Sequence, residues 1–238
     1  MGELVGVTRV AHSDRSGTGL VAWDPLDPAL LVSGTPVQRG WLCDENTETG
    51  YMAGVWDCTA FVDQPGPYPV DEFMLLLEGS VVMALPDGAK ITVEAGQAFV
   101  IPKGFRCQWT MPDYVRKVFM IVDDPVTEGA ENPSLDRITV PDWTCIGAEG
   151  PVGAQNTWFL NSTGRMAVSV AQLASGRTAS AAAPTHELIH VLDGSLTLSG
   201  EGGALSIGPG ETGYIRAGSV LGRETTGPTS TLTATYAP

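Results

Sequence analysis

The stretch EFMLLLEGS at residues 72–80 returns about 115 residues later as ELIHVLDGS at residues 187–195. In both copies a glutamate precedes a glycine by seven positions, across an apolar run. A second pair follows each of these, GQAFVIPKG at 96–104 and GETGYIRAG at 210–218. A duplicated unit of this length predicts two similar domains, so the question is which copy holds a working site.

Short apolar runs separated by turn residues predict an all-β protein. The chain of 238 residues has 29 Gly and 17 Pro, and 43% of its residues are hydrophobic. Strands at this spacing, without helical crossovers, favour antiparallel sheets closed as barrels, and Asp87-Gly88 is a hairpin signal. We expect strands at 51–61, 72–85, 90–93, 98–101, 106–111 and 115–122, and again at 155–160, 165–173, 187–198, 204–207, 212–215 and 229–236.

Irregular, polar and proline-containing segments also predict the domain boundaries. Residues 1–30 are irregular and are expected to form an arm that packs on a domain or on a partner subunit. The first domain is expected at 31–123 and the second at 142–238. The segment between them, 124–141, is polar, contains proline and is weakly patterned, which is typical of a linker.

Composition excludes several classes of function. The net charge is −14 and no basic patch is visible, which argues against nucleic acid as a partner. No run of 18 apolar residues predicts a membrane span, and the N-terminus lacks the apolar core of a secretory signal. The four cysteines do not suggest a disulfide scaffold. A cytoplasmic protein with reduced thiols is the expectation.

The spacing E-x6-G followed by G-x5-P-x-G resembles the two motifs of the cupins, over most of the chain. The N-terminal copy is similar to the branch of (S)-ureidoglycine aminohydrolase and the ethanolamine-utilisation cupins. The residues that carry this likeness are Gly54–Cys58, Asp71–Phe73, Leu77–Gly79, Ile101–Phe105, Trp109 and Arg116-Lys117. The resemblance implies two tandem cupin-type jelly-roll β-barrels, a bicupin, and cupins commonly pair through their sheets, so we expect a homodimer.

In metal-binding cupins two histidines, spaced H-x-H, precede the glutamate, and a third follows the final glycine of the second motif by three positions. Here Glu72 remains, residues 64–68 contain no histidine, and the third position is Cys107. In the second copy Glu187 remains, but the histidine positions hold Ala181, Ala183 and Leu221. The three-histidine site is therefore missing from both copies. A metal-free barrel is favoured, and a divalent metal at Glu72 and Cys107, helped by Tyr68 or Asp71, stays open.

Residues 186–190 read HELIH and match the H-E-x-x-H motif of zinc peptidases. That motif requires a helix, whereas Pro184 and Gly194 confine the segment and a β-rich stretch follows it. On a strand His186 and His190 share one face and Glu187 takes the other. A metalloprotease is therefore disfavoured, although adventitious zinc on the two histidines stays open.

The N-terminal half holds 12 of the 17 aromatic residues and all three lysines. Strand alternation places several of these side chains toward the inside of one barrel, with Tyr68 at the mouth. The alternative is that the aromatic residues only fill the core. The expected catalytic residues are Glu72 and Cys107, and the expected substrate-binding residues are Trp56, Tyr68, Met74, Trp109 and Lys117.

A carboxylate in such a pocket would have a raised pKa and would serve as a general acid or base near neutral pH. Either Arg116 or Lys117 is expected to pair with Glu72 or Asp71. No histidine is available to activate Cys107, which makes it the weaker candidate nucleophile. The favoured hypothesis is action on a small polar metabolite, an amine, ureide or carbonyl compound. The alternatives are a non-catalytic binding protein and a purely structural dimer component.

Overall fold

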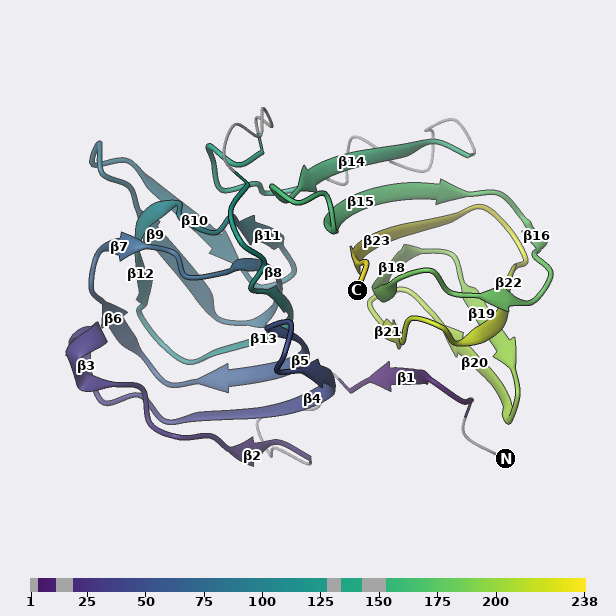
Figure 1. The fold of residues 1–238 in the computed structure, drawn as a ribbon, viewed down its shortest axis with the longest axis horizontal. Helices are drawn as coiled ribbons and strands as arrows, with labels where there is room; N and C mark the ends of the chain where they lie inside the picture. Colours follow the sequence, from purple (N-terminus) through teal and green to yellow (C-terminus); the bar gives the residue numbers. More distant parts are fainter. Residues whose placement is uncertain (1–3, 12–18, 128–133, 143–152) are drawn as a thin grey trace. The chain divides into compact units, whose positions relative to one another are not determined.

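The structure is a computed structural model that describes residues 4–11, 19–127, 134–142 and 153–238. It divides into two compact units, residues 12–140 and residues 141–238 together with 1–11 (Figure 1). In the described residues the only helical element is the short 3-10 turn η1 (Pro28–Leu30). The predicted all-β class is confirmed, and each unit holds antiparallel sheets of the barrel type. No helix in the described parts of the chain is long and apolar enough to cross a bilayer.

The N-terminal unit is built from two sheets. One has the strand order β10-β9-β12-β6-β3 with β7 beside β12, and the other has the order β11-β8-β13-β5-β4-β2. The strands are β2 (Val21–Ala22), β3 (Leu31–Gly34), β4 (Gln38–Asn46), β5 (Tyr51–Cys58), β6 (Phe61–Asp63), β7 (Gly66–Pro67), β8 (Asp71–Glu78), β9 (Ser80–Ala84), β10 (Lys90–Glu94), β11 (Ala98–Ile101), β12 (Arg106–Met111) and β13 (Val115–Val122).

The C-terminal unit repeats this plan. Its sheets have the orders β1-β21-β18-β23-β15-β14 and β16-β22-β19-β20, with β17 beside β22. The strands are β1 (Val7–Val10), β14 (Gln155–Leu160), β15 (Met166–Leu173), β16 (Gly176–Arg177), β17 (Ala181–Ala182), β18 (His186–Asp193), β19 (Leu196–Gly200), β20 (Gly203–Ile207), β21 (Thr212–Ile215), β22 (Val220–Thr225) and β23 (Thr229–Tyr236).

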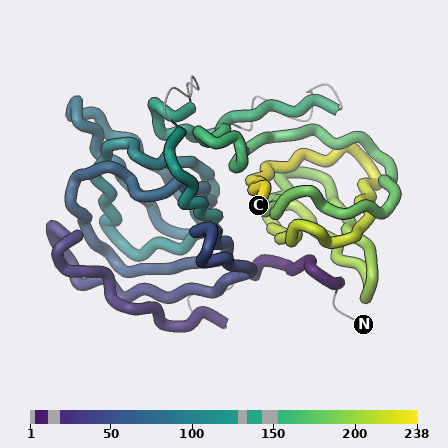
Figure 2. Tube along the Cα trace, in the orientation of Figure 1, coloured from purple at the N-terminus to yellow at the C-terminus, as the bar shows by residue number. Residues whose placement is uncertain are grey.

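The beginning of the chain belongs to the C-terminal unit. Strand β1 pairs with β21 over four residues, and the purple trace of β1 runs beside that strand in Figure 2. Leu4 and Val7 are buried in the core of the C-terminal barrel, with Ala183 and Leu221. The predicted arm of residues 1–30 is thus divided, because β2 instead pairs with β4 in the N-terminal unit.

The motif glycine of each copy ends a strand that the sequence pattern predicted to be continuous. Gly79 separates β8 from β9 with a φ of +80°, and Gly194 separates β18 from β19 with a φ of +82°. A Cβ at Gly79 would lie 2.1 Å from the carbonyl oxygen of Tyr114. Both the left-handed backbone and this close approach require glycine, so the turn is fixed at the same place in both barrels.

Several segments differ from their sequence-based interpretation. Strand β4, nine residues long, and strand β22 were not predicted, because their polar residues hide the alternation that marks a strand. Within the predicted linker, Thr139 pairs with Val100 through two backbone hydrogen bonds of 2.8 and 3.0 Å, and Ile138 joins the core of the N-terminal barrel. Residues 128–133 of that segment lie outside the described residues.

Strand alternation determines which side chains of β8 point into the barrel. Met74 and Leu76 belong to the barrel core, so Glu72 on the same face also points into the barrel. The neighbouring strand β13 pairs with β8, with Lys117 opposite Leu76, and a one-residue bulge in β8 falls at Leu77. The C-terminal copy has its bulge at the equivalent Leu192. The duplicated sequence therefore folds into the same local geometry twice.

Candidate functional site

Glu72 is the polar centre of the N-terminal barrel interior. Its side chain is 5% exposed, and its Oε1 lies 2.7 Å from the Nζ of Lys117. The hydroxyl of Tyr68 donates a hydrogen bond to the other carboxylate oxygen, Oε2. Both oxygens therefore have a donor, and the sequence-based expectation that one basic residue of the Arg116-Lys117 pair contacts Glu72 is met by Lys117.

The ammonium of Lys117 is enclosed by aromatic rings. Nζ lies 4.7 Å from the ring centroid of Trp56, 5.1 Å from that of Trp109 and 6.0 Å from that of Phe119. It is also 3.2 Å from the sulfur of Met74. Cation–π attraction and the Glu72 carboxylate together hold the Lys117 ammonium in place inside the barrel.

Tyr68 occupies a position where the resembling metalloproteins have a histidine. Gly66 pairs with Cys107 in the N-terminal barrel just as Ala181 pairs with Leu221 in the C-terminal barrel, so Tyr68 corresponds to Ala183. Burial is the main cause that raises the pKa of the Tyr68 hydroxyl well above its usual value, and the Glu72 charge adds to the shift. The hydroxyl thus stays protonated and donates to Glu72.

Cys107 and Asp63 lie close enough to Tyr68 for their charges to raise its pKa further. Burial, with help from the charge of Asp63, raises the pKa of the Cys107 thiol to about 11. Burial also raises the pKa of Asp63 to about 6, although the backbone N–H of Trp109 donates to its Oδ1 at 2.7 Å and opposes the shift. At neutral pH the thiol is therefore protonated, which disfavours Cys107 as a nucleophile or metal ligand.

The two tryptophans of the predicted pocket differ in their polar contacts. The Nε1–H of Trp56 donates to Oε1 of Gln38 at 2.9 Å. The Nε1–H of Trp109 is buried and has no hydrogen-bond partner in the structure. The Trp109 ring stacks on Phe99, with centroids 6.1 Å apart.

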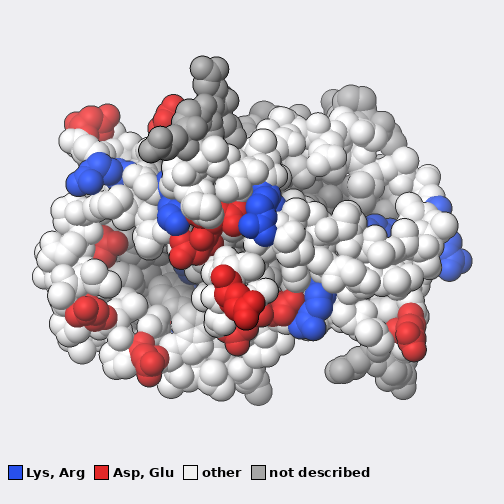
Figure 3. Space-filling model, in the orientation of Figure 1, with Lys and Arg blue, Asp and Glu red and all other residues white. Residues whose placement is uncertain are grey.

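The predicted site residues lie inside the barrel and are almost entirely buried. Trp56 is 8% exposed and Cys107 and Lys117 are 6% exposed, whereas Met74 is fully buried. The surface of the N-terminal unit is hollowed near its middle in Figure 3, with acidic side chains beside the hollow. All seven residues selected from the sequence belong to or pack against this interior: Trp56, Tyr68, Glu72, Met74, Cys107, Trp109 and Lys117.

The side chains at the metal-ligand positions do not fit a divalent cation. Gly66 offers no side chain, and the Tyr68 hydroxyl and the Cys107 thiol are held in their protonated forms. The carboxylate of Glu72 is already neutralised by the ammonium of Lys117. A second positive charge beside that ammonium would be repelled strongly in a buried site. No group of three or more potential ligands from His, Cys, Asp and Glu occurs within the described ranges.

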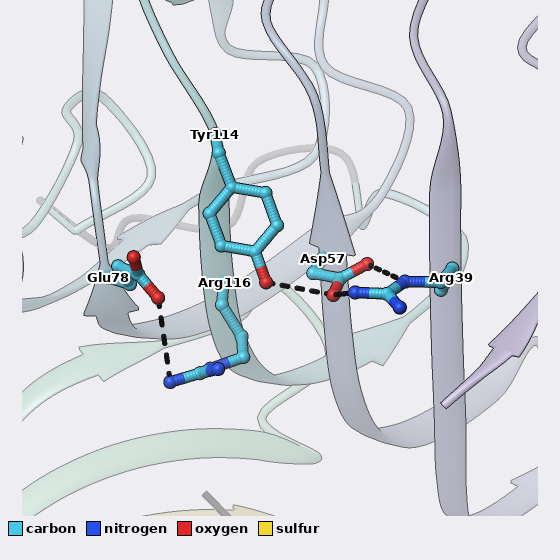
Figure 4. A network of polar contacts seen from close by, with 5 residues as sticks. All are labelled: Arg39, Asp57, Glu78, Tyr114 and Arg116. Atoms are coloured by element: carbon cyan, nitrogen blue, oxygen red, sulfur yellow. Dashed lines mark hydrogen bonds and ion pairs between the residues drawn. The ribbon is translucent and has the colours of Figure 1, made fainter. Parts of the chain in front are cut away.

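The outer face of the same sheet has a separate polar network (Figure 4). Arg39 donates to Asp57 through two nitrogens, Nε at 3.0 Å, and the hydroxyl of Tyr114 donates to Asp57 at 2.9 Å. Arg116 faces Glu78 at 3.7 Å. Asp57 and Arg116 alternate with the inward-facing Trp56 and Lys117, so this network lies outside the barrel.

The motif glutamate of the C-terminal barrel has a different ionic partner and more apolar neighbours. Glu187 is buried and its Oε1 lies 2.6 Å from Nη2 of Arg223. The remaining cupin ligand positions are apolar, and Ala183 and Leu221 pack in the aliphatic core with Leu4 and Val7.

The H-E-x-x-H segment is part of strand β18, as the sequence context predicted. His186 and His190 point to the face opposite Glu187. The Nδ1 of His186 lies 2.6 Å from the Tyr214 hydroxyl, and the Nδ1 of His190 lies 3.0 Å from Oγ1 of Thr212. The arrangement of a zinc peptidase, with both histidines and the glutamate on a helix, is therefore absent from this segment.

Sequence reasoning missed Asp63 and Gln38. Asp63 follows Phe61 by two positions on a strand that was cut short in the prediction, so its inward orientation was not recognised. Gln38 belongs to the unpredicted strand β4. The alternation of Phe61 and Asp63 about Val62 was the available signal for the first of them.

Comparison with known proteins finds a family model that matches part of the N-terminal unit. Residues 47–119 match the model of the EutQ-like cupin domain. No curated protein matches the sequence.

Solved structures resemble nearly the whole chain. A protein of unknown function from Pseudomonas syringae pv. tomato is 20% identical, with a TM-score of 0.70, and the match covers 96% of this chain and 98% of that one. A cupin 2 conserved barrel domain protein from Leptotrichia buccalis is 11% identical, with a TM-score of 0.60, covering 91% and 97%. A salicylate 1,2-dioxygenase mutant from Pseudoaminobacter salicylatoxidans is 11% identical, with a TM-score of 0.54, covering 79% and 71%.

Proposed function

Since the chain belongs to the cupin superfamily and folds as two cupin barrels, we propose that its N-terminal barrel binds a small polar metabolite and that Glu72 is its acid/base group. One observation carries the proposal. The Glu72 carboxylate is held between an ammonium and a phenol inside an aromatic barrel, at the end where the interior residues retain some exposure.

This arrangement suits proton transfer. Tyr68 and Lys117 each donate a hydrogen bond to one oxygen of the carboxylate and so fix its orientation. A substrate proton delivered to Glu72 would therefore enter a preorganised network rather than bulk water. The aromatic walls supply the apolar surface typical of small-molecule sites. The class proposed for the metabolite is an amine, ureide or carbonyl compound.

The experiment is a ligand screen followed by a turnover assay. A panel of small amines, ureides and carbonyl compounds is tested by thermal shift, and each ligand found is then incubated with the protein and followed by NMR. We expect at least one ligand to be converted, and Glu72→Gln to abolish the conversion. Turnover that survives Glu72→Gln would remove Glu72 from the mechanism.

The second candidate function is binding without catalysis. It is favoured by the side chains at the ligand positions, since Gly66, Tyr68 and Cys107 do not fit the metal of the resembling enzymes. A ligand that binds tightly to the N-terminal barrel and is recovered unchanged would establish this alternative. In either case we expect a homodimer, which sedimentation would test.

A further inference from the structure

Asp63 is a carboxylate at a position where the other barrel has an uncharged residue. Its Oδ1 accepts the backbone N–H of Trp109 at 2.7 Å. In the C-terminal barrel, Oγ1 of Thr178 accepts the backbone N–H of Arg223 at 3.0 Å. The two donors hold equivalent positions on β12 and β22, so Asp63 and Thr178 serve the same structural purpose. The fold therefore requires an oxygen acceptor here, but it does not require a negative charge.

The carboxylate of Asp63 lies at the edge of the N-terminal barrel interior. Along β6 it alternates with Phe61, a residue of the barrel core, and its cross-strand neighbour Leu31 also packs against that core. Burial, and then the charge of Asp63, raise the pKa of the Cys107 thiol inside the barrel. Asp63 therefore faces the same interior as the candidate site.

One oxygen of this carboxylate remains available. Among the described residues the Asp63 carboxylate accepts a single hydrogen bond, at Oδ1, and has no cationic partner. The other oxygen, Oδ2, has no partner and yet is not one of the buried unpaired polar atoms, so it is in contact with solvent. Burial raises the pKa of Asp63 to about 6. At neutral pH the carboxylate is therefore charged and accessible.

The N-terminal interior consequently has an excess negative charge. Glu72 and Lys117 neutralise one another, which leaves the charge of Asp63 unbalanced. In the C-terminal barrel the corresponding glutamate and arginine also neutralise one another, and the neutral Thr178 adds no charge. A partly buried carboxylate is costly unless it is paired, so a cation is the group that the N-terminal interior lacks.

We propose that Asp63 binds an ammonium group of the ligand in the N-terminal barrel, with Oδ2 as the acceptor. The proposal rests on the proposed function and narrows its ligand class from an amine, ureide or carbonyl compound to an amine that is cationic at neutral pH. An ammonium donates a charge-assisted hydrogen bond to a carboxylate, which is about twice as strong as a bond between neutral groups. Asp63 thus sets the specificity, while Glu72 keeps the acid/base role.

The test follows the backbone N–H of Trp109, which reports on Asp63 through their hydrogen bond. The full-length protein is labelled with nitrogen-15 in its six tryptophans and observed by two-dimensional NMR, and Trp109→Phe assigns the signal. Propylammonium is the cation probe, propanol its neutral counterpart and propionate an anion, all at constant ionic strength. We expect propylammonium to shift the Trp109 signal with saturation, propanol to bind at least tenfold more weakly, and propionate to leave the signal unmoved.

Two variants separate this subsite from general attraction of cations to an acidic protein. Asp63→Thr copies Thr178 of the other barrel, so it keeps an acceptor for the Trp109 N–H and removes the charge. Affinity for propylammonium, measured from the methyl signal of the probe, should fall at least tenfold. The control is Asp113→Asn, because Asp113 also accepts a backbone N–H, that of Tyr114 at 2.7 Å, but is exposed. It should leave the affinity within twofold.

Acidification gives a readout that a merely structural role would not move. Between pH 7.5 and 5 the probe stays charged, and the Cys107 thiol and the Tyr68 hydroxyl stay protonated. The ionised fraction of Asp63, with its pKa of about 6, falls about tenfold over this range, and the affinity for propylammonium should fall with it. Asp63→Thr should lose this pH dependence, which distinguishes Asp63 from Glu72 and Lys117.

A Trp109 signal that propylammonium does not move, or equal loss of affinity in Asp63→Thr and Asp113→Asn, would overturn the subsite. The proposed function would survive that result if an uncharged ureide or carbonyl ligand bound and depended on Glu72. If propylammonium behaves as expected but no compound of the panel is converted, the proposed function fails while the subsite remains.

Discussion

The two barrels of this chain have the same motif glutamate but neutralise it from different strands. Glu72 is paired with Lys117 on β13, and Glu187 is paired with Arg223 on β22. Arg223 stands two residues after Leu221, as Trp109 stands two residues after Cys107, so the second cation replaces the tryptophan of the first barrel. A buried carboxylate is costly without a partner, and the two copies place that partner on different strands.

The surroundings of the two pairs diverge further. The Lys117 pair lies among aromatic rings at an end where the interior residues keep some exposure. In the C-terminal barrel the equivalent ligand positions hold Ala183 and Leu221, and Leu4 and Val7 complete an aliphatic core around them. The comparison teaches that the same motif glutamate can be buried in two environments, an aromatic interior in the N-terminal barrel and an aliphatic one in the C-terminal barrel.

The largest effect is expected from breaking the Glu72–Lys117 pair. Lys117→Met leaves a buried carboxylate without its counter-charge and should lower the free energy of unfolding of the N-terminal barrel by about 3–5 kcal/mol. Glu72→Gln combined with Lys117→Met should recover most of that loss. Chemical denaturation followed by tryptophan fluorescence measures both, because four of the six tryptophans lie within residues 12–140.

The equivalent change in the C-terminal barrel should matter less. The side chain of Arg223 is 34% exposed, so water can solvate the Glu187 carboxylate after Arg223→Met. Equal losses in Lys117→Met and Arg223→Met would contradict the difference in environment described for the two glutamates.

The next effect tests the role of the N-terminal segment. Leu4 is 7% exposed in the C-terminal core, so Leu4→Ala should destabilise the C-terminal barrel by about 2 kcal/mol. Its neighbour Val5 is 62% exposed, and Val5→Ala is the control that should leave stability unchanged. Hydrogen exchange resolves which barrel responds. Loss of protection in β8 or β13 after Leu4→Ala would show that this segment does not belong to the C-terminal core alone.

A smaller, pH-dependent effect is expected at Asp63. Burial raises its folded-state pKa from 3.8 to about 6, so the folded protein binds this proton more tightly than the unfolded chain. The resulting stability is fully present below about pH 4 and is lost as the pH rises through 6. After allowance for solvent screening we expect about 1 kcal/mol. Unfolding midpoints of the wild type and Asp63→Asn, measured between pH 4 and 8, should converge at the acid end. Parallel curves would contradict the assignment.

The smallest effect concerns Cys107, whose pKa is raised to about 11. At pH 8 its thiolate fraction is on the order of a hundredfold below that of an ordinary thiol, and iodoacetamide should alkylate it correspondingly more slowly than a free small-molecule thiol. Peptide mass spectrometry distinguishes Cys107 from the other cysteines. Alkylation as fast as that of the free thiol would restore Cys107 as a candidate nucleophile.

Much of the fold followed from the sequence, because glycines and apolar alternation are local signals. The spacing from Glu72 to Gly79 predicted the repeat, and the left-handed backbone at Gly79 and Gly194 explains why both copies keep the glycine. Strand β4 could not be predicted, since three of its nine residues are charged, Arg39, Asp44 and Glu45, and it has no clean alternation. The pairing of β1 with β21 joins residues more than 200 positions apart, which no local pattern can specify.

The sequence predicted which residues face the barrel interior, but not which of their side chains contact one another. Alternation places Trp56, Glu72 and Trp109 on inward faces. It does not reveal that Lys117, opposite Leu76, extends past Met74 to reach Glu72, because that depends on the rotamer of a long side chain. The unused N–H of Trp109 likewise depends on what surrounds it in three dimensions.

The central claim is that the N-terminal barrel, and not the C-terminal one, binds the ligand through its motif glutamate. The most direct test compares the same substitution in both barrels. Once a ligand has been found by the screen, its affinity is measured by calorimetry for the wild type, Glu72→Gln and Glu187→Gln. Binding should be lost, by at least tenfold, in Glu72→Gln and should remain within twofold of the wild type in Glu187→Gln. Loss of binding in Glu187→Gln, with Glu72→Gln unaffected, would place the site in the C-terminal barrel and contradict the account.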